Sequence, residues 1–420
     1  MSKWAKTTLG KIADIITGPF GSQLHQSDYV KQGIPIVMPQ DIGNRNINYS
    51  TINYVSEEDA TRLKRYSTVA NDILYARRGD VEKHAFVRAK DAGVLCGTGC
   101  LRVRINSNEV EPAFLSFYLN REETRKWLVT HAVGTNMPNL NTDILSDVPI
   151  AYPTLKEQRK IVKVLNCLEE RIILNEKIND NLEQQLMFLY DYWFTQFDFP
   201  DKDGNPYQTS GGKMVWNDTL KRNIPENWKV QSVISNCLSS IIKPGVEIFN
   251  TKTYLATADV KGTSISTGTI VDYDGRESRA NMQPSINSVW FAKMKNSIKH
   301  IYLNKEMQPI ISSCILSTGF CGLQCNEISF EYIASYVSNA YFEIHKDMLA
   351  HGATQEAVNN DDLVGVHIII PEDAVLRAYH EATQAIYAQI SKNICENQEL
   401  VKLRDWLLPM LMNGQATISD

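Results

Sequence analysis

The stretch that decides the fold runs from Leu155 to Phe197 and reads LKEQRKIVKVLNCLEERIILNEKINDNLEQQLMFLYDYWFTQF. It follows Pro153, and a proline blocks helix before itself but not after. Apolar residues then recur every three or four positions, which is the spacing of a coiled-coil seam. The seam consists of Ile161, Leu165, Leu168, Ile172, Leu182, Leu186, Leu189 and Trp193. An uninterrupted helix of this length would span roughly 60 Å at ~1.5 Å per residue, which favours a spacer or clamp.

Two polar residues, Asn175 and Asn179, fall on the seam. A buried asparagine weakens a coiled coil but fixes its register, whereas an exposed stretch of helix would explain the same residues without a partner. If two such helices pair antiparallel, we expect Asn175 to lie near Asn397 and Asn179 near Asn393.

The second half of the chain repeats the first at an offset of 218 residues. The matched pairs before the helix are Gly134/Gly352, Asn141/Asn359, Asp143/Asp361, Leu145/Leu363, Val148/Val366, Ile150/Ile368, Pro153/Pro371 and Arg159/Arg377. Along the helix, Asn175 and Asn179 match Asn393 and Asn397. A polar interruption repeated at the same heptad positions indicates a duplicated unit, a globular domain followed by a long helix, rather than a solenoid of many short repeats.

Short β-like runs at 34–38, 72–76 and 101–105 and a helix at 111–129 predict a mixed α/β class (α+β mixed). We expect a first domain over 1–153, a first helix over 154–198, a linker over 199–223, a second domain over 224–371, and a second helix with a tail over 372–420. The linker is rich in Gly, Asp and Asn, and its Tyr207 and Trp216 suggest that it is pinned against something. Pro409 should kink or stop the second helix near Leu408.

Bulk properties set wide limits. The 420 residues are 43% hydrophobic, enough for ordinary cores, and the length suggests two or three domains. The polar start MSKWAKTTLG and eight cysteines without a CxxC pair predict a cytoplasmic protein with reduced thiols and no metal. A net charge of −5 counts mildly against a nucleic-acid binder, although an acidic protein can still present a basic face.

Polar and basic residues follow the predicted strands in both halves. In the first half these candidates for DNA binding are Gln40, Asn44, Arg45, Arg77, Arg78, Lys83 and His84. In the second half they are Thr257, Lys261, Lys293, Lys295, Lys299 and His300, of which Lys293 matches Arg77 and Lys299-His300 matches Lys83-His84. Arginine can grip guanine or phosphate, and Gln or Asn can read adenine. Each residue can equally sit in a solvated turn or cap local backbone.

The ends of the two long helices are apolar around most of their circumference. The residues concerned include Phe188, Tyr192, Trp193, Phe197, Trp406 and Met410. One seam does not need so many apolar side chains, so they predict either a partner-binding surface or packing onto the chain's own domains.

The motifs of an active site are missing from the sequence. The nearest match to the Asn/Asp-Pro-Pro-aromatic loop of an amino-methyltransferase is Gly204-Asn205-Pro206-Tyr207, which lacks the second proline. No GxxxxGK[ST] loop for ATP occurs, and no spacing implies a catalytic triad. We therefore predict a chain that is not an enzyme.

Several stretches resemble the specificity subunits of type I restriction-modification systems, and the resemblance covers the whole chain. They are PYQTSGGKMVWNDTLKRNIPENW (206–228), YLATADVKG (254–262), SRANMQP (278–284) and VWFAKMKNSIKH (289–300). The doubled plan of domain and helix is similar to that family too. The resemblance adds Ser278, Arg279 and Asn281 to the candidates for DNA contact.

The resemblance implies a DNA reader with two target-recognition domains, joined by two long antiparallel coiled-coil helices. Its partners would be double-stranded DNA, two methyltransferase (modification) subunits and the restriction/translocase subunits. S-adenosylmethionine, ATP and Mg would be bound in those subunits and not in this chain. The alternatives are a stand-alone DNA-modifying enzyme, methyltransferase or nuclease, and a pure protein scaffold.

Overall fold

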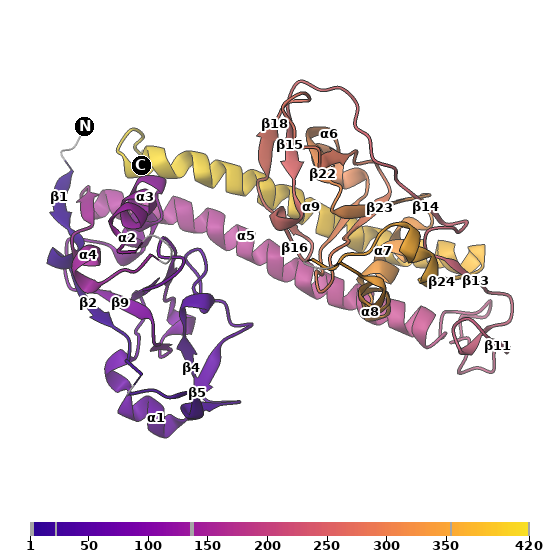
Figure 1. The fold of residues 1–420 in the computed structure, drawn as a ribbon, viewed down its shortest axis with the longest axis horizontal. Coiled ribbons are helices and arrows are strands. Elements are labelled where there is room, and N and C mark those ends of the chain that lie inside the picture. The colour runs from indigo at the N-terminus through magenta and orange to yellow at the C-terminus, as the bar shows by residue number, and fades with distance from the viewer. Residues whose placement is uncertain (1–3, 22, 135–137, 353–354, 419–420) are drawn as a thin grey trace. The chain divides into compact units, whose positions relative to one another are not determined.

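The computed structural model describes residues 4–21, 23–134, 138–352 and 355–418 (Figure 1). The chain divides into two compact units. Unit 1 comprises Met1–Leu168 and Arg404–Asp420, and unit 2 comprises Glu169–Leu403. The boundary passes through both long helices, α5 (Leu155–Tyr190) and α9 (Asp373–Met412), so each helix contributes to both units.

Helix α5 begins and ends close to its predicted limits. Thr154 and Glu157 cap its start reciprocally: the Thr154 N–H donates to Glu157 Oε2 at 3.1 Å, and the Glu157 N–H donates to Thr154 Oγ1 at 3.5 Å. A π-helical turn over Asp191–Thr195 extends it, and the left-handed backbone of Phe197 (φ 62°) ends it. Pro409 does not stop α9 near Leu408, because the helix continues through it to Met412, and the alternative outcome of a kink at Pro409 stays a prediction.

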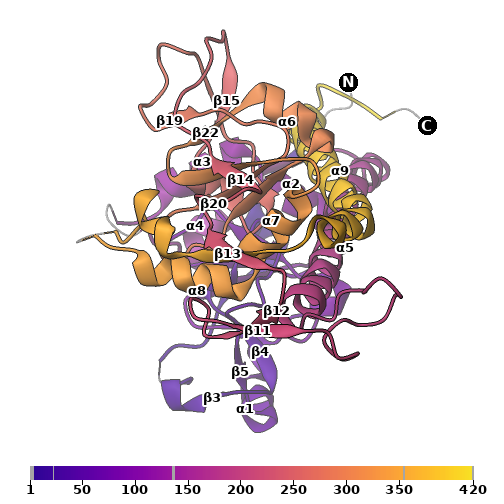
Figure 2. The same ribbon diagram turned by 90° about the vertical axis from the view of Figure 1, so that its right-hand side faces the viewer.

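Within unit 2 the two long helices run antiparallel and side by side, as the views in Figures 1 and 2 agree. Asn175 Nδ2 donates to Asn397 Oδ1 at 2.9 Å, and Asn393 Nδ2 donates to Asn179 Oδ1 at 2.8 Å. Arg171 makes two hydrogen bonds of 2.8 and 2.9 Å to the Glu396 carboxylate. The predicted pairing of the four asparagines is therefore confirmed, while their role in setting register stays a prediction.

The described residues of unit 1 form three antiparallel or mixed sheets and four short α-helices. The sheets, in spatial order, are β1(Ala5–Thr8)-β10(Pro149–Tyr152); β2(Ala13–Thr17)-β9(Cys100–Ile105)-β6(Ile73–Ala76)-β7(His84–Phe86); and β3(Tyr29–Val30)-β5(Asn53–Val55)-β4(Ile34–Val37)-β8(Leu95–Cys96). The helices are α1(Glu57–Arg62), α2(Pro112–Leu119), α3(Glu122–His131) and α4(Thr142–Ser146). The single helix predicted over 111–129 is two helices, because Arg121 takes an extended backbone conformation between them.

Unit 2 repeats this plan. Its sheets are β13(Lys229–Ser232)-β24(His367–Ile370); β14(Ser239–Ile241)-β23(Phe320–Cys325)-β20(Ser288–Ala292)-β21(His300–Leu303); β18(Thr269–Val271)-β15(Lys252–Leu255)-β22(Cys314–Ser317)-β19(Ala280–Met282); β16(Val260–Lys261)-β17(Ser264–Ile265); and β11(Met214–Asn217)-β12(Arg222–Pro225). Its short helices are α6(Gln308–Ser313), α7(Phe330–Ser338) and α8(Ala340–Leu349). The mixed α/β class is confirmed.

The predicted linker over 199–223 is largely folded. It holds β11 and the start of β12, and Phe199 is buried in the unit 2 core, where its ring stacks on Tyr207 at 4.7 Å and on Trp228 at 4.8 Å. Tyr207 is pinned as expected, but Trp216 is exposed. Aromatic anchors outweigh a composition that is otherwise typical of a linker.

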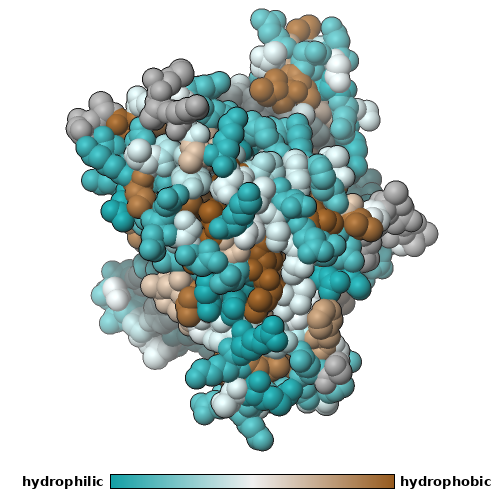
Figure 3. Space-filling view, turned by 90° about the vertical axis from the view of Figure 1, so that its left-hand side faces the viewer, coloured by the Kyte–Doolittle hydropathy of each residue, from teal (hydrophilic) through white to brown (hydrophobic). Residues whose placement is uncertain are grey.

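Hydrophobic side chains are distributed over the surface and along the helices. On the face shown in Figure 3, hydrophobic side chains appear as separate groups among hydrophilic ones. No helix in the described ranges combines the length and apolar character needed to cross a bilayer.

Candidate nucleic-acid interface

Arg77 and Lys293 occupy equivalent positions on the two units, each just after a central strand. The Arg77 N–H donates to Gly99 O at 2.7 Å, and its carbonyl accepts from the Leu140 N–H at 2.8 Å. The Lys293 N–H donates to Gly319 O at 2.9 Å, and its carbonyl accepts from the Val358 N–H at 3.0 Å. Equivalent backbone hydrogen bonds therefore hold a cationic residue at the same position in the fold of each unit.

Both side chains are partly buried, yet neither cationic head forms a hydrogen bond or ion pair with a residue that the structure describes. The Nε of Arg77 is itself buried and lacks a hydrogen-bond partner among those residues. Buried donors normally have partners, so an unsatisfied one needs an explanation, and an acceptor on a bound ligand supplies one.

The other unit 1 candidates lie on the loops that follow β4 and β6 and at the start of β7. Gln40 and Asn44 are exposed in the turn after β4, and the Arg45 N–H in that turn donates to His84 O at 2.8 Å. Arg78 is exposed beside Arg77, and Lys83 pairs with Asp80. The loops after β4 and β6 thus meet at one edge, as their polar composition predicted.

Arg45 and His84 are buried, and their predicted contact with DNA is wrong. Arg45 Nε donates to Ser116 Oγ at 2.9 Å, and its guanidinium lies 3.3 Å from the centroid of the Phe117 ring. His84 Nε2 lies 2.9 Å from the same Ser116 Oγ. Burial, and then the charge of Arg45, lower the pKa of His84 to about 3. Side chains committed to the core in this way cannot reach a duplex.

In unit 2, two of the predicted lysines are engaged by the protein itself. Lys299 Nζ donates to Thr257 O at 2.5 Å, and Lys295 Nζ lies 2.7 Å from Glu356 Oε2. Lys261 is exposed. Among these candidates, Lys293 and Lys261 keep ammonium groups without a hydrogen bond or ion pair to any described residue.

His300 is also buried, so the prediction that it contacts DNA is wrong. Its Nε2 lies 2.8 Å from Glu343 Oε1, and Lys346 Nζ lies 2.6 Å from Glu343 Oε2. Burial alone would raise the pKa of Glu343, but hydrogen bonds from His300 and Lys346 bring it below its usual range. Sequence reasoning missed Glu343 and Lys346, although their spacing of three on a helix was a signal for an ion pair.

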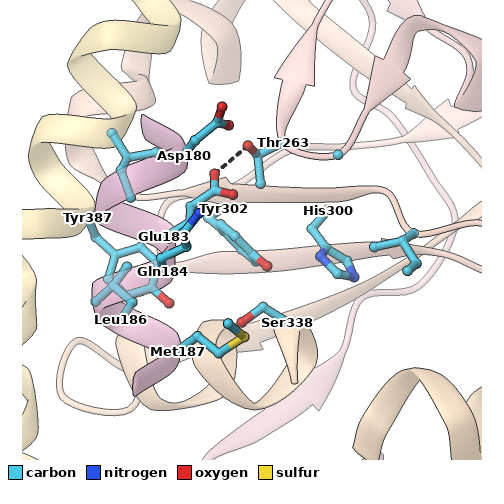
Figure 4. Close-up of a pocket in the computed structure, with 13 residues that line it drawn as sticks. Asp180, Glu183, Gln184, Leu186, Met187, Thr263, His300, Tyr302, Ser338 and Tyr387 are labelled. Atoms are coloured by element: carbon cyan, nitrogen blue, oxygen red, sulfur yellow. Dashed lines mark hydrogen bonds between the residues drawn. The ribbon is translucent and has the colours of Figure 1, made fainter. Parts of the chain in front are cut away.

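His300 lines a hollow of about 360 Å³ in unit 2 that is open to the surface beside Met187 and Ile298 (Figure 4). The opposite wall comes from α5, where Glu183 accepts a hydrogen bond of 2.5 Å from Thr263. Burial raises the pKa of Glu183.

The residues suggested by the family resemblance lie near β19, at the edge of a sheet. Ser278 and Arg279 are exposed, and Asn281 is half-buried. Arg279 O accepts from the Thr318 N–H at 2.8 Å, next to the Gly319 carbonyl that binds Lys293. Among the described residues of unit 1 this edge has no counterpart, because β8 ends the sheet there.

The predicted partner surface divides into exposed and buried residues. Phe188 (68% exposed), Tyr192 (40%) and Trp406 (61%) face solvent, and Met410 is half-buried. Trp193 and Phe197 are buried in unit 2, Trp193 against Tyr379 at 5.4 Å and Phe197 against Trp228 at 5.7 Å. Their assignment to a partner surface is wrong, because they complete the unit's own core.

All eight cysteines are free thiols, and the described His, Cys, Asp and Glu side chains form no group of three that could hold a metal ion.

Residues 1–184 match the family model described as "Type I restriction modification DNA specificity domain". The MjaIX specificity subunit of Methanocaldococcus jannaschii is 23% identical, covering 98% of this chain and 93% of that protein. The HindI specificity subunit of Haemophilus influenzae is 22% identical, covering 99% of this chain and all of that protein. Among solved structures, the S subunit of a type I system from M. genitalium aligns over 98% of this chain and 96% of that one, with 14% identity and a TM-score of 0.49. Residues 1–184 thus match the type I DNA specificity domain, and the whole chain is similar to type I specificity subunits, which confirms the resemblance seen in its sequence.

Proposed function

We propose that this chain is the sequence-specific DNA-binding subunit of a type I restriction-modification complex, and that it reads a bipartite site. The observation that carries the proposal is the pair Arg77 and Lys293, two cations held by the same backbone hydrogen bonds on the two units, of which Arg77 has a buried Nε without a partner among the described residues. Arginine and lysine recognise guanine edges and phosphate. Each unit would read one half of the site.

The chain itself would carry out no chemistry. It would position two methyltransferase subunits and the restriction/translocase subunits on the DNA, and S-adenosylmethionine, ATP and Mg would be bound there. Phe188 and Tyr192 in unit 2 and Trp406 in unit 1 are exposed aromatic side chains suited to anchor such partners.

The experiment is a selection from a pool of random-sequence duplexes by the full chain in the assembly isolated with it, followed by mapping of methylated adenines. The expected result is two short specified half-sites separated by a fixed, unspecified spacer. A single continuous site, or binding that does not weaken with salt, would contradict the proposal, because phosphate contacts make affinity fall as salt rises. Binding of labelled S-adenosylmethionine by the isolated chain would favour a stand-alone enzyme instead.

The spacer between half-sites should follow the length of α5 and α9, since each helix begins in one unit and ends in the other. One heptad added to both helices keeps their seam in phase and lengthens the pair by roughly 10 Å at ~1.5 Å per residue. At about 3.4 Å per base pair, the preferred spacer should grow by about three base pairs with unchanged half-sites. Affinity should fall as well, since about three base pairs rotate one half-site by roughly 100°.

A heptad added to one helix alone is the control and should destabilise the pair. If methylation on a library of randomised spacers showed an unchanged preference, the helices would not set the distance.

A further inference from the structure

Phe20 is an exposed aromatic residue that neither the sequence motifs nor the proposed function accounts for. It is 53% exposed in the loop that follows β2. The base of that loop is fixed: the Gly18 N–H donates to Cys100 O at 2.9 Å, and a Cβ at Gly18 would lie 2.0 Å from Gly97 O. A side chain larger than hydrogen is excluded there, so the loop is held closely against the turn between β8 and β9, whose Gly99 carbonyl accepts from the Arg77 N–H.

The ring of Phe20 lies beside the Arg77 guanidinium, with Cζ 5.6 Å from the ring centroid. This distance is within the range of a cation–π contact. Two other guanidinium groups of unit 1 have protein acceptors: Arg104 binds the Asp72 carboxylate at 2.8 and 2.7 Å, and Arg102 binds the Ser67 carbonyl at 2.7 Å, although Arg102 Nε, like Arg77 Nε, has no partner among the described residues. Arg77 is instead placed against a ring, and a ring orients a guanidinium without occupying its hydrogen-bond donors.

We propose that Phe20 is a positioning residue for Arg77, holding the guanidinium so that its free N–H groups point to an acceptor on DNA. The proposal rests on the function proposed above and adds a specificity-determining residue to unit 1. Phe20 also lines a hollow of about 370 Å³ with Thr17, Gln23 and Arg65, so the ring borders a second polar surface next to Arg77.

Unit 2 has no such partner for Lys293 in the part of the chain that the structure describes. After β14 the chain turns away: the Gly245 N–H donates to Asn281 O at 2.8 Å, and Val246 packs against a cluster that includes Tyr254, Ala280 and Ile315. The effect of Phe20 should therefore be confined to the half-site that unit 1 reads.

A double-mutant cycle tests this inference. The full chain, in the assembly isolated with it, binds its selected duplex and duplexes altered in either half-site, and Phe20→Ala, Arg77→Ala and the double variant are compared. Phe20→Ala should weaken binding about 2- to 5-fold, at the unit 1 half-site only, and should have little further effect once Arg77 is Ala. Phe20→Tyr keeps the ring and should restore binding, whereas Phe20→Leu should not.

The outcomes separate the two proposals. If Arg77→Ala leaves both half-sites unchanged, the proposed role of Arg77 is wrong. If Arg77→Ala weakens one half-site and Phe20→Ala does not, the inference about Phe20 is overturned and the proposed function stands. Additive losses would also overturn it, because they would show a ring that contacts DNA, or a protein partner, without acting through Arg77. Val69→Ala, which truncates another exposed apolar side chain of unit 1, is the matched control and should change nothing.

Discussion

Units 1 and 2 share a backbone frame but bury different polar groups at the same place. In unit 1, Arg45 and His84 meet on the hydroxyl of Ser116, whereas in unit 2, His300 and Lys346 meet on the carboxylate of Glu343. Strand order in the central sheet is the same, β2-β9-β6-β7 against β14-β23-β20-β21. The frame is therefore specified by backbone pairing, and the buried polar centre can be rebuilt so long as every charge finds a partner.

The outer helices show the same division between frame and side chains. On α3 the outward residues Glu123, Lys126 and Thr130 are polar, and on α8 the corresponding Tyr341, Ile344 and Met348 are mostly apolar. The inward positions remain buried on both helices. The two copies therefore share the same buried positions on this helix but differ in the polarity of its exposed side chains.

The largest expected effect comes from breaking the buried charges of unit 2. Lys346→Met leaves the Glu343 carboxylate buried with one partner fewer, which should cost about 3–5 kcal/mol of the free energy of unfolding of unit 2. Urea unfolding followed by proteolysis, with peptides from each unit identified by mass spectrometry, measures the loss in each unit.

The paired variant Lys346→Met/Glu343→Leu removes both charges and should recover much of that loss. Equal destabilisation of units 1 and 2 by the single change would show that the two frames do not unfold independently.

Next comes the division of labour on DNA. Arg77→Ala should weaken binding or relax specificity at one half-site and Lys293→Ala at the other, each by about 1–3 kcal/mol for a good base contact. Binding to duplexes altered in one half-site at a time measures both effects. Either change relaxing both half-sites alike would refute the assignment of one half-site to each unit.

The next expected effect is on stability: lowering the pH should destabilise unit 1 more than unit 2. Burial and the charge of Arg45 hold the pKa of His84 at about 3, with Arg125 and Tyr75 as its other polar or charged neighbours, whereas the unfolded chain takes up a proton near 6.5. The contribution of His84 to the stability of unit 1 is fully present above about pH 6.5 and should fall by about 1.4 kcal/mol for each pH unit below it. Burial raises the pKa of Glu183 and Glu331 in unit 2, and these groups stabilise that unit as pH falls.

The check is the same urea experiment at pH 7.5 and pH 5.5. His84→Gln should abolish the difference for unit 1, and a variant that kept the full difference would assign the effect to other groups.

Sequence reasoning recovered what depends on period and repetition. The helix seam, the duplication and the equivalence of Arg77 with Lys293 all follow from the spacing of residues along the chain, which can be read without knowing the fold. Burial of single polar residues could not be predicted, because Arg45 and His84 look like surface residues until both are seen to contact Ser116, which lies 71 and 32 positions away along the chain. Trp193 and Phe197 were misassigned for the same reason: an apolar helix end looks alike whether its own domain or a partner covers it.

The smallest expected effect concerns the four asparagines, where the two copies of the helix meet. Replacing Asn175, Asn179, Asn393 and Asn397 by Leu should raise the free energy of unfolding slightly, because buried amides weaken a seam. The substitutions should also remove the free-energy cost of a shift in helix register. A shift of one heptad now sets Asn175 opposite Ile390 or Arg404 and leaves a buried amide without its hydrogen-bond partner. With leucine at these positions, the same shift leaves no polar group unpaired.

Spin labels at Arg171→Cys and Glu396→Cys, with Cys167 and Cys237 replaced by Ser, report that register as a distance distribution. These two positions face each other directly, since Arg171 Nε lies 2.8 Å from Glu396 Oε1. The parent should give one narrow distance and the four-leucine variant a broad or multiple one. Replacing only Asn175 and Asn397 leaves the Asn179–Asn393 amide pair in place and should keep the narrow distance. A narrow distribution in the four-leucine variant would mean that side-chain packing along the seam, and not the amide pairs, fixes how the two helices align.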